Sequence, residues 1–286
     1  MDYSDCYINI PDVERHFPVY RIITRERLKE IFEKQVNTLV KPHLWEDPFE
    51  DLLVKVEGQL PTGELVEFGQ RYDFYGQCWT LRGNTDAMWR IYSGDKKSVR
   101  IKVRIRTLIQ TFAPWAIGPV FIGKVRYSTQ QNLLRWARTV LRDEDDPTIN
   151  LLVRTLLVKR AAFSHEQEVR LLYLDPRENL ETIFQYHIDP HKFIEEIVLD
   201  PRVPAAEVQQ SMDEIRAVTG FRGPIKQSDL YAPPKTMVLH LGTAYEKFVK
   251  TAPSTTYEGK SGRKVLGINS HKQLILPPAE LETSRK

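Results

Sequence analysis

Residues 163–173, FSHEQEVRLLY, place charged side chains two residues apart inside an otherwise apolar run. Successive side chains of a β-strand point to opposite faces. If the stretch is one strand, Glu166, Glu168 and Arg170 share a face with Leu172, and the other face is largely apolar. The pattern therefore predicts a strand that carries two neighbouring carboxylates and a guanidinium.

Two interpretations fit this pattern. Carboxylates two apart on a strand stand about 6–7 Å from each other, so repulsion and burial would raise the pKa of one while Arg170 holds the other ionised. Such a pair suits binding of a sugar hydroxyl and acid–base catalysis. The alternative is a rim strand whose solvated face carries a Glu–Arg pair. Spacing alone favours the alternative.

The stretches around this run predict further strands and helices. Residues 18–24, PVYRIIT, are typical of a strand, and Thr24 is typical of an N-cap for the helically spaced RERLKEIFEKQV that follows. YGQCWTL at 75–81 predicts a strand, and NTDAMWRIYSG at 84–94 predicts a short capped helix. Few strands alternate with helices in βαβ order, so we expect an α+β fold.

A second charged run alternates with apolar residues between positions 99 and 106, which predicts a half-buried strand over all eight residues. Its polar face carries Arg100, Lys102, Arg104 and Arg106. Guanidinium groups bind phosphates in bidentate fashion, so this face is a candidate substrate-binding surface. The alternative, which the pattern favours, is a solvated face over an apolar core.

The amino-acid composition along the chain indicates the domain organisation and excludes several classes of protein. The 286 residues are 41% hydrophobic and 28% charged, with 41 basic and 38 acidic side chains, so the sequence does not indicate a dedicated nucleic-acid binder. We expect an arm at residues 1–17, one α+β domain at 18–235 and a polar C-terminal extension at 236–286. The sequence shows no apolar window long enough to span a membrane and no secretory signal, so we expect a cytoplasmic protein.

Common motifs for cofactors and metals are missing from the sequence. It has no Walker loop, no GxGxxG and no GxSxG, and its seven histidines show no metal-ligand spacing. Trp79 and Tyr92 have flat rings that suit stacking on a ligand, although aromatic residues beside a short helix are more often core. No metal is expected.

Five ordered stretches resemble a large bacterial family, the domain of unknown function 2971. The resemblance covers roughly residues 18–232 and is carried by VYRIITRERLKEIFEKQVNTLVKPHLWEDPFED, QCWTLRGNTDAMWRIYSGDKKSVRIKV, AAFSHEQEVRLLYL, FIEEIVLDPRV and IKQSDLY. Two departures from the family's usual pattern are Glu46, where the loop usually has Asn, and Arg90-Ile91 within the W-x-x-Y segment. The layout is similar to the ADP-ribosyltransferase fold of DNA-modifying toxins, which implies a mixed, mostly antiparallel split sheet with flanking helices.

That resemblance implies roles for particular side chains. Glu168 would stabilise an oxocarbenium-like transition state of NAD, and Glu166 would orient or deprotonate the acceptor. Arg21 would bind the diphosphate or a ribose of NAD. The remaining implied contacts to NAD and to a nucleic-acid or protein acceptor come from Tyr20, Trp79, Thr80, Tyr92 and from Arg170, Arg100, Lys102 and Arg104.

The resemblance therefore favours a NAD-consuming transferase with a toxin, defence or modification role. The alternative is a non-catalytic nucleic-acid- or protein-binding module that keeps the same fold. The two hypotheses differ in whether Glu168 faces a cleft that also contains Arg21.

Overall fold

The computed structural model describes residues 4–45, 47, 50, 58–59, 62–66, 73–143, 149–177, 180–232, 242–243, 256–258 and 264–266. The chain divides into two compact units, Met1–Tyr231 and Ala232–Lys286. In the second unit, β15 (Thr256–Glu258) pairs with β16 (Lys264–Leu266) in antiparallel fashion. The arm, domain and extension expected from the sequence stay a prediction.

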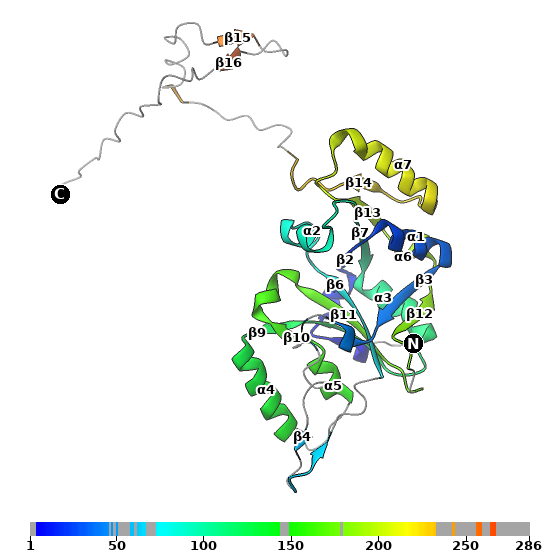
Figure 1. The fold of residues 1–286 in the computed structure, drawn as a ribbon, viewed down its shortest axis with the longest axis vertical. Coiled ribbons are helices and arrows are strands. Elements are labelled where there is room, and N and C mark those ends of the chain that lie inside the picture. The colour runs from blue at the N-terminus through cyan, green and yellow to red at the C-terminus, as the bar shows by residue number, and fades with distance from the viewer. Residues whose placement is uncertain are drawn as a thin grey trace, which may run out of the picture. The chain divides into compact units, whose positions relative to one another are not determined.

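One mixed sheet of ten strands forms the first unit, and most of its neighbours are antiparallel (Figure 1). Its main path runs β1 (Tyr7–Ile8), β8 (Val120–Lys124), β11 (Glu168–Leu174), β6 (Phe74–Thr80), β2 (Pro18–Ile23), β7 (Val99–Arg104), β13 (Glu196–Leu199) and β14 (Ile225–Gln227). A branch of β3 (Val36–Val40) and β12 (Ile183–His187) leaves the path at β6. Only the β1–β8 and β13–β14 pairs of this sheet are parallel. The expected α+β class with a mixed, mostly antiparallel sheet is confirmed.

The sheet splits along one edge of β6. That edge bonds to β2 only at Tyr20 opposite Thr80, and to β3 only at Val40 opposite Gly76. The other edge of β6 pairs with β11 along the whole length of both strands. Because β2 and β6 meet at a single pair, their surroundings can open into a cleft at the Thr80 end.

β11 lies in the interior of the sheet, and all seven of its residues are buried. It pairs with β6 on one edge and with β8 on the other. The rim strand with a solvated face, which spacing alone favoured, is therefore wrong. The single strand expected over residues 163–173 is also wrong, because Ala161–Glu166 form a 3₁₀ helix, η6, and Gln167 has a φ of 43°. That left-handed residue turns the chain between Glu166 and Glu168.

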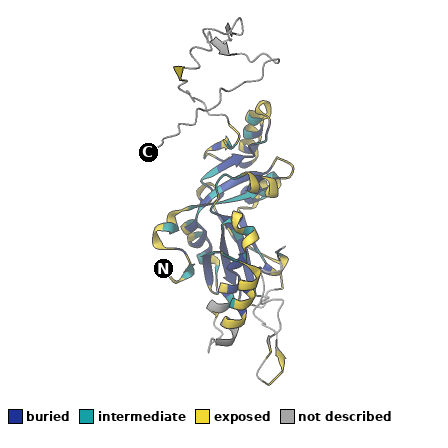
Figure 2. Cartoon of the chain, turned by 90° about the vertical axis from the view of Figure 1, so that its left-hand side faces the viewer, coloured by how far each residue is buried: buried dark blue, intermediate teal, exposed yellow. Residues whose placement is uncertain are grey.

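Helices cover both faces of the sheet, and Figure 2 shows buried residues along the strands and exposed residues on the outer sides of the helices. The helices of this unit are α1 (Arg25–Lys34), α2 (Asp86–Tyr92), α3 (Ile105–Phe112), α4 (Gln130–Asp143), α5 (Ile149–Thr155), α6 (Pro190–Phe193) and α7 (Val208–Thr219). The larger core packs α1, α3 and α7 against one face. The smaller core packs α5 against β6, β8 and β11 on the other face. α7 and α4 lie at opposite ends of the unit (Figure 1).

Local signals in the sequence mark where helices begin and end. The Thr24 side chain accepts a hydrogen bond from the Arg27 N–H, which confirms the predicted N-cap of α1. The alternating run at 99–106 is a strand only to Arg104, and α3 begins at Ile105. The prediction failed there because Ile105 also begins a helical spacing of apolar residues that is buried in the larger core. The Glu46 departure lies outside the described residues.

A two-stranded parallel ribbon stands beside the sheet. It pairs β9 (Arg126–Ser128) with β10 (Val158–Arg160). A separate antiparallel pair joins β4 (Gly58–Gln59) and β5 (Leu65–Val66). β10 leads directly into η6, which ends at Glu166, and β11 then begins at Glu168.

Close packing at Gly123 of β8 generates a prediction on stability. A Cβ at this position would overlap Leu157 Cδ1 and lie 3.2 Å from the Ile8 carbonyl oxygen. We expect Gly123→Ala to lower the free energy of unfolding by about 1–3 kcal/mol, because backbone and core would have to shift. Urea unfolding measures this loss, and Gly94→Ala is the matched control because nothing lies within 4 Å of its Cβ. Equal stability of the two variants would contradict the packing argument.

Candidate functional site

A cavity of about 760 Å³ opens beside the split between β2 and β6. Its walls come from β2, β6, α2, β10, η6 and β11, and from Leu44, Trp45, Asp47 and Glu50. Arg21, Glu166 and Glu168 all line it, together with Tyr20 and Tyr92. Segments that are far apart in the sequence thus bring the two glutamates and the arginine to one cavity.

Lys159 of β10 is the centre of the charged cluster in this cavity. Its Nζ lies 2.5 Å from Glu166 Oε2, 2.6 Å from Glu168 Oε1 and 2.6 Å from Glu50 Oε1. An ammonium group has three N–H donors and no acceptor, so three carboxylates satisfy it completely. The side chains of Lys159 and of all three glutamates are at most 7% exposed.

Arg170 lies behind Glu168 and is fully buried. Its Nε donates to Glu168 Oε2 at 2.7 Å, and its Nη1 donates to the Leu156 carbonyl oxygen at 2.7 Å. Its Nη2 is 3.2 Å from Glu50 Oε1, and the guanidinium stands 4.4 Å over the Trp45 ring. Arg170 is not among the lining residues, so it holds Glu168 from behind and does not face a substrate.

Burial and these ion pairs separate the proton affinities of the two glutamates. Burial raises the pKa of Glu166 to about 7, and the hydrogen bond and the charge of Glu168 act in the same direction. Burial also disfavours the charge of Glu168, but Arg170 and Lys159 outweigh that effect and hold its pKa well below the usual range. The surroundings therefore favour the charged form of Glu168 and bring the pKa of Glu166 close to neutral pH.

The backbone turn at Gln167 sets the positions of both carboxylates. The Thr80 hydroxyl donates to the Glu166 carbonyl oxygen, and the Glu168 N–H donates to the Tyr127 hydroxyl oxygen at 2.8 Å. The Tyr92 hydroxyl donates to Glu166 Oε1 at 3.3 Å. Lys159 bridges the two carboxylates. On a regular strand the two side chains would instead stand two residues apart along the strand. Thr80 lines the cavity, but its hydroxyl is already bonded to the backbone.

Arg21 is the unpaired cation of the site. It lines the cavity from β2, and no described residue forms a hydrogen bond or ion pair with its guanidinium. Burial lowers its pKa, which reflects the unfavourable charge of a guanidinium without a counter-ion. A guanidinium in this condition is suited to an anionic ligand, which it can bind through two parallel N–H donors.

Among the aromatic residues predicted to contact a ligand, Trp79 is placed differently from the tyrosines. Trp79 is 2% exposed, its indole N–H donates to Gln77 Oε1 at 2.8 Å, and its ring packs edge-on against Phe193. The indole therefore belongs to the larger core even though Trp79 borders the cavity. Tyr92 is 45% exposed, and the Tyr20 ring lies 4.7 Å from the Arg100 guanidinium.

The basic face of β7 is paired with carboxylates within the fold. Arg100 Nη2 is 3.0 Å from Glu196 Oε1, and Lys102 and Arg104 lie 3.2 and 2.5 Å from the Glu195 carboxylate oxygens. None of these three cations lines the cavity. Arg106, which was expected on the same strand face, lies in α3 with its Nη1 3.3 Å from His16 Nδ1.

Sequence reasoning missed Lys159 and Glu50, which make the cluster. The only signal for Lys159 is a charge inside the apolar run LLVKRAA at 156–162. Glu50 lies among several acidic residues and has no distinguishing pattern. In the part of the chain that the structure describes, no group of three His, Cys, Asp or Glu side chains is placed to hold a metal ion. No described helix is long and apolar enough to cross a membrane.

The comparisons with known proteins come from a family model and from solved structures. Structures of Thermus sp. 2.9 DarT are similar over most of this chain. The complex with NAD+ is 14% identical, with 78% of this chain and 100% of that chain covered at a TM-score of 0.35. The complex with ADP-ribosylated ssDNA is 12% identical, with 78% and 97% covered at a TM-score of 0.35. No curated protein matches the chain.

The family model covers the centre of the first unit. It spans residues 88–171, from α2 to the middle of β11, and therefore contains Lys159, Glu166 and Glu168. Its description is "Protein of unknown function (DUF2971)". The resemblance that the sequence motifs indicated is confirmed over this segment, which matches the family of unknown function DUF2971.

Proposed function

We propose that this chain is a NAD-consuming ADP-ribosyltransferase that uses the cavity between β2, β6 and β11. One observation carries the proposal: Arg21 and the Glu166–Glu168 pair line the same cavity. An unpaired guanidinium is suited to a diphosphate, and a carboxylate held ionised is suited to a developing positive charge. The similarity of the sequence layout to the ADP-ribosyltransferase fold points to NAD as the substrate class.

Glu168 would act on the ribose of NAD. Cleavage of the nicotinamide–ribose bond passes through a transition state in which the sugar carries positive charge, as in glycoside hydrolysis. Lys159 and Arg170 keep Glu168 ionised, and each donates to a different oxygen. A carboxylate oxygen can accept more than one hydrogen bond, so Glu168 would also accept from a ribose hydroxyl.

Glu166 would act on the acceptor. Its pKa of about 7 lets it take up a proton at neutral pH and release it again, as a general base requires. Its Oε2 faces Lys159 and its Oε1 faces the Tyr92 hydroxyl at the exposed side of the cavity. Nucleic acid and protein both remain candidate acceptors, and a toxin or defence role in the cytoplasm stays a prediction.

A second candidate is a non-catalytic binding module with the same fold. One observation favours it: Lys159, Arg170 and the three glutamates form a buried network of ion pairs, as a purely structural cluster would. Activity measurements separate the two candidates.

The first of three predictions on activity concerns Glu168. We expect the wild-type protein to release nicotinamide from labelled NAD in the presence of DNA, RNA or protein acceptors, and Glu168→Gln to lose about a hundredfold or more of that rate. Glu33→Gln, an exposed change on α1, is the matched control and should keep full activity. Circular dichroism checks the folding of each variant. A folded wild type that neither releases nicotinamide nor labels any acceptor would establish the binding module instead.

The second prediction concerns pH. Because Glu166 must be deprotonated to accept a proton and its pKa is about 7, kcat/KM should rise about tenfold per pH unit below 7 and level off above it. Glu166→Gln should remove this limb together with most of the transfer to the acceptor, while hydrolysis of NAD is less affected. A profile that is flat between pH 5 and 8 would exclude Glu166 as the base.

The third prediction concerns Arg21. We expect Arg21→Ala to raise the KM for NAD about tenfold or more, since one charge-assisted contact to a phosphate is lost. Arg21→Lys should recover only part of that loss because an ammonium lacks the planar fork. Initial rates over a range of NAD concentrations measure both. An unchanged KM in Arg21→Ala would remove the diphosphate role.

A further inference from the structure

The Tyr92 hydroxyl contacts the carboxylate that is proposed to act on the acceptor. It donates to Glu166 Oε1 at 3.3 Å, and both residues line the cavity between β2, β6 and β11. A general base must lie within hydrogen-bond reach of the proton that it removes, and such contacts are often long before a substrate binds. The position of an acceptor beside Glu166 is therefore already held by a hydroxyl group of the chain itself.

A series of contacts connects this hydroxyl to the carboxylate that is proposed to bind the ribose. Glu166 Oε2 lies 2.5 Å from Lys159 Nζ, and the same Nζ lies 2.6 Å from Glu168 Oε1. A single ammonium group thus holds the two carboxylates side by side. A ribose bound by Glu168 would lie next to Tyr92 as well, and a nucleophile that is fixed beside the reacting carbon needs no encounter with a second molecule.

Tyr92 is presented from a fixed helix end. It is the last residue of α2, and Trp89 of the same helix is 1% exposed. Arg202 Nη2 donates to the carbonyl oxygens of Trp89 and Ser93 at 2.9 and 2.6 Å, so the guanidinium caps the C-terminal end of α2. The helix therefore holds the tyrosine in place against Glu166.

The ring and the hydroxyl of Tyr92 lie in different surroundings. The residue is 45% exposed, but burial raises the pKa of Tyr92, and the charge of Glu166 acts in the same direction. The phenol is therefore neutral near pH 7. A neutral hydroxyl is a weak nucleophile and requires an adjacent base, and the Glu166 carboxylate is in contact with it.

Three other nucleophilic groups that line the cavity are held differently. The Thr80 hydroxyl donates to the backbone carbonyl oxygen of Glu166. The Lys159 ammonium group is engaged by three carboxylates. Burial raises the pKa of the Cys78 thiol and Glu168 raises it further, so the reactive thiolate is disfavoured.

We propose that the chain modifies itself by accepting ADP-ribose on the Tyr92 hydroxyl. The inference rests on the transferase activity proposed above, with NAD as the donor. The bond between C1′ of the ribose and the nicotinamide nitrogen breaks, and its electron pair leaves with neutral nicotinamide. Tyr92 Oη forms the new bond to C1′, and its proton passes to Glu166 Oε1. Glu168 stabilises the positive charge of the sugar while the first bond breaks and the second forms.

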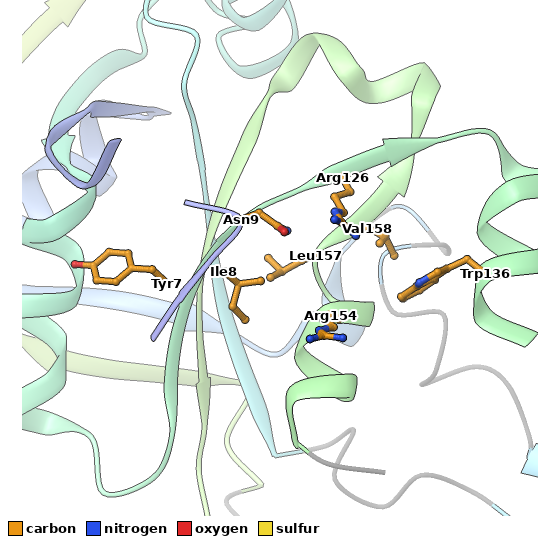
Figure 3. A pocket seen from close by; sticks show the side chains of 8 residues that line it. All are labelled: Tyr7, Ile8, Asn9, Arg126, Trp136, Arg154, Leu157 and Val158. Carbon is orange, nitrogen blue, oxygen red and sulfur yellow. The ribbon is translucent and has the colours of Figure 1, made fainter. Parts of the chain in front are cut away.

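Tyr7 is a tyrosine outside this arrangement and supplies a control. It lines a separate cavity of about 520 Å³ that shares no lining residue with the first, and Figure 3 shows its hydroxyl directed away from the other labelled side chains. Its half-buried ring lies beneath the Arg15 guanidinium, 4.2 Å from the ring centroid. No residue in the described ranges forms a hydrogen bond with the Tyr7 hydroxyl. Tyr7 is therefore a phenol beside a cavity without a base in contact.

Mass spectrometry of the full chain, incubated with NAD and without an added acceptor, tests the proposal. We expect the wild-type protein to gain ADP-ribose and tandem spectra to place it on Tyr92. Tyr92→Phe removes only the hydroxyl group and should lower the labelled fraction about tenfold or more, whereas Tyr7→Phe should be labelled like the wild type. Glu166→Gln should also lower the labelled fraction, because the hydroxyl then lacks its base.

Nicotinamide is measured in the same reactions, so the two proposals fail in different ways. Nicotinamide release from an unmodified chain overturns self-modification and leaves the transferase proposal standing. A label on another residue, such as His165 at the same cavity, has the same meaning, as does full labelling of Tyr92→Phe or Glu166→Gln. The absence of both nicotinamide and label overturns both proposals. Circular dichroism spectra that match the wild type establish that each variant is folded.

Discussion

A buried ammonium group must be surrounded by acceptors, and the arrangement of the candidate site follows from how Lys159 meets this requirement. An unpaired charge in the interior is strongly unfavourable, so three carboxylates converge on one Nζ. They come from the segment around Glu50, from the end of η6 and from the start of β11. Lys159 thereby links three parts of the chain that no secondary structure connects directly. Arg170 adds a second cation, and the cluster then has one carboxylate more than it has cations.

That excess of one carboxylate explains why the pKa values of Glu166 and Glu168 shift in opposite directions. Glu168 contacts both cations, whereas Lys159 is the one cation that Glu166 contacts among the described residues, beside the neutral Tyr92 hydroxyl. The left-handed residue Gln167 makes this possible, because it takes Glu166 off the strand and turns it toward the cavity. The split of the sheet at β6 supplies the space, and Arg21 supplies a cation that lines the cavity and has no partner among the described residues.

Much of the fold could be predicted from the sequence, because periodicity and caps act locally. Thr24 marks the start of a helix where the structure has it, and the alternation around Val99 correctly indicates β7. The charged clusters could not be predicted in the same way. Arg100 looks like a phosphate ligand in its own strand, but its partner Glu196 lies on a strand that pairs with β7 only in the folded chain. Equally, the alternation at residues 163–173 gave no sign of the turn at Gln167, which depends on tertiary contacts such as the hydrogen bond from Thr80.

The sharing of Lys159 by Glu50, Glu166 and Glu168 has a consequence for how this site can vary among related sequences. Groups that share one partner are not independent, and substitutions within such a network combine non-additively. Loss of Glu50 would leave more of the lysine's charge to the other two carboxylates and would shift the proton equilibrium of Glu166. Substitutions at these four positions are therefore coupled. A replacement that preserves the fold at one position changes which residues the other three positions can hold.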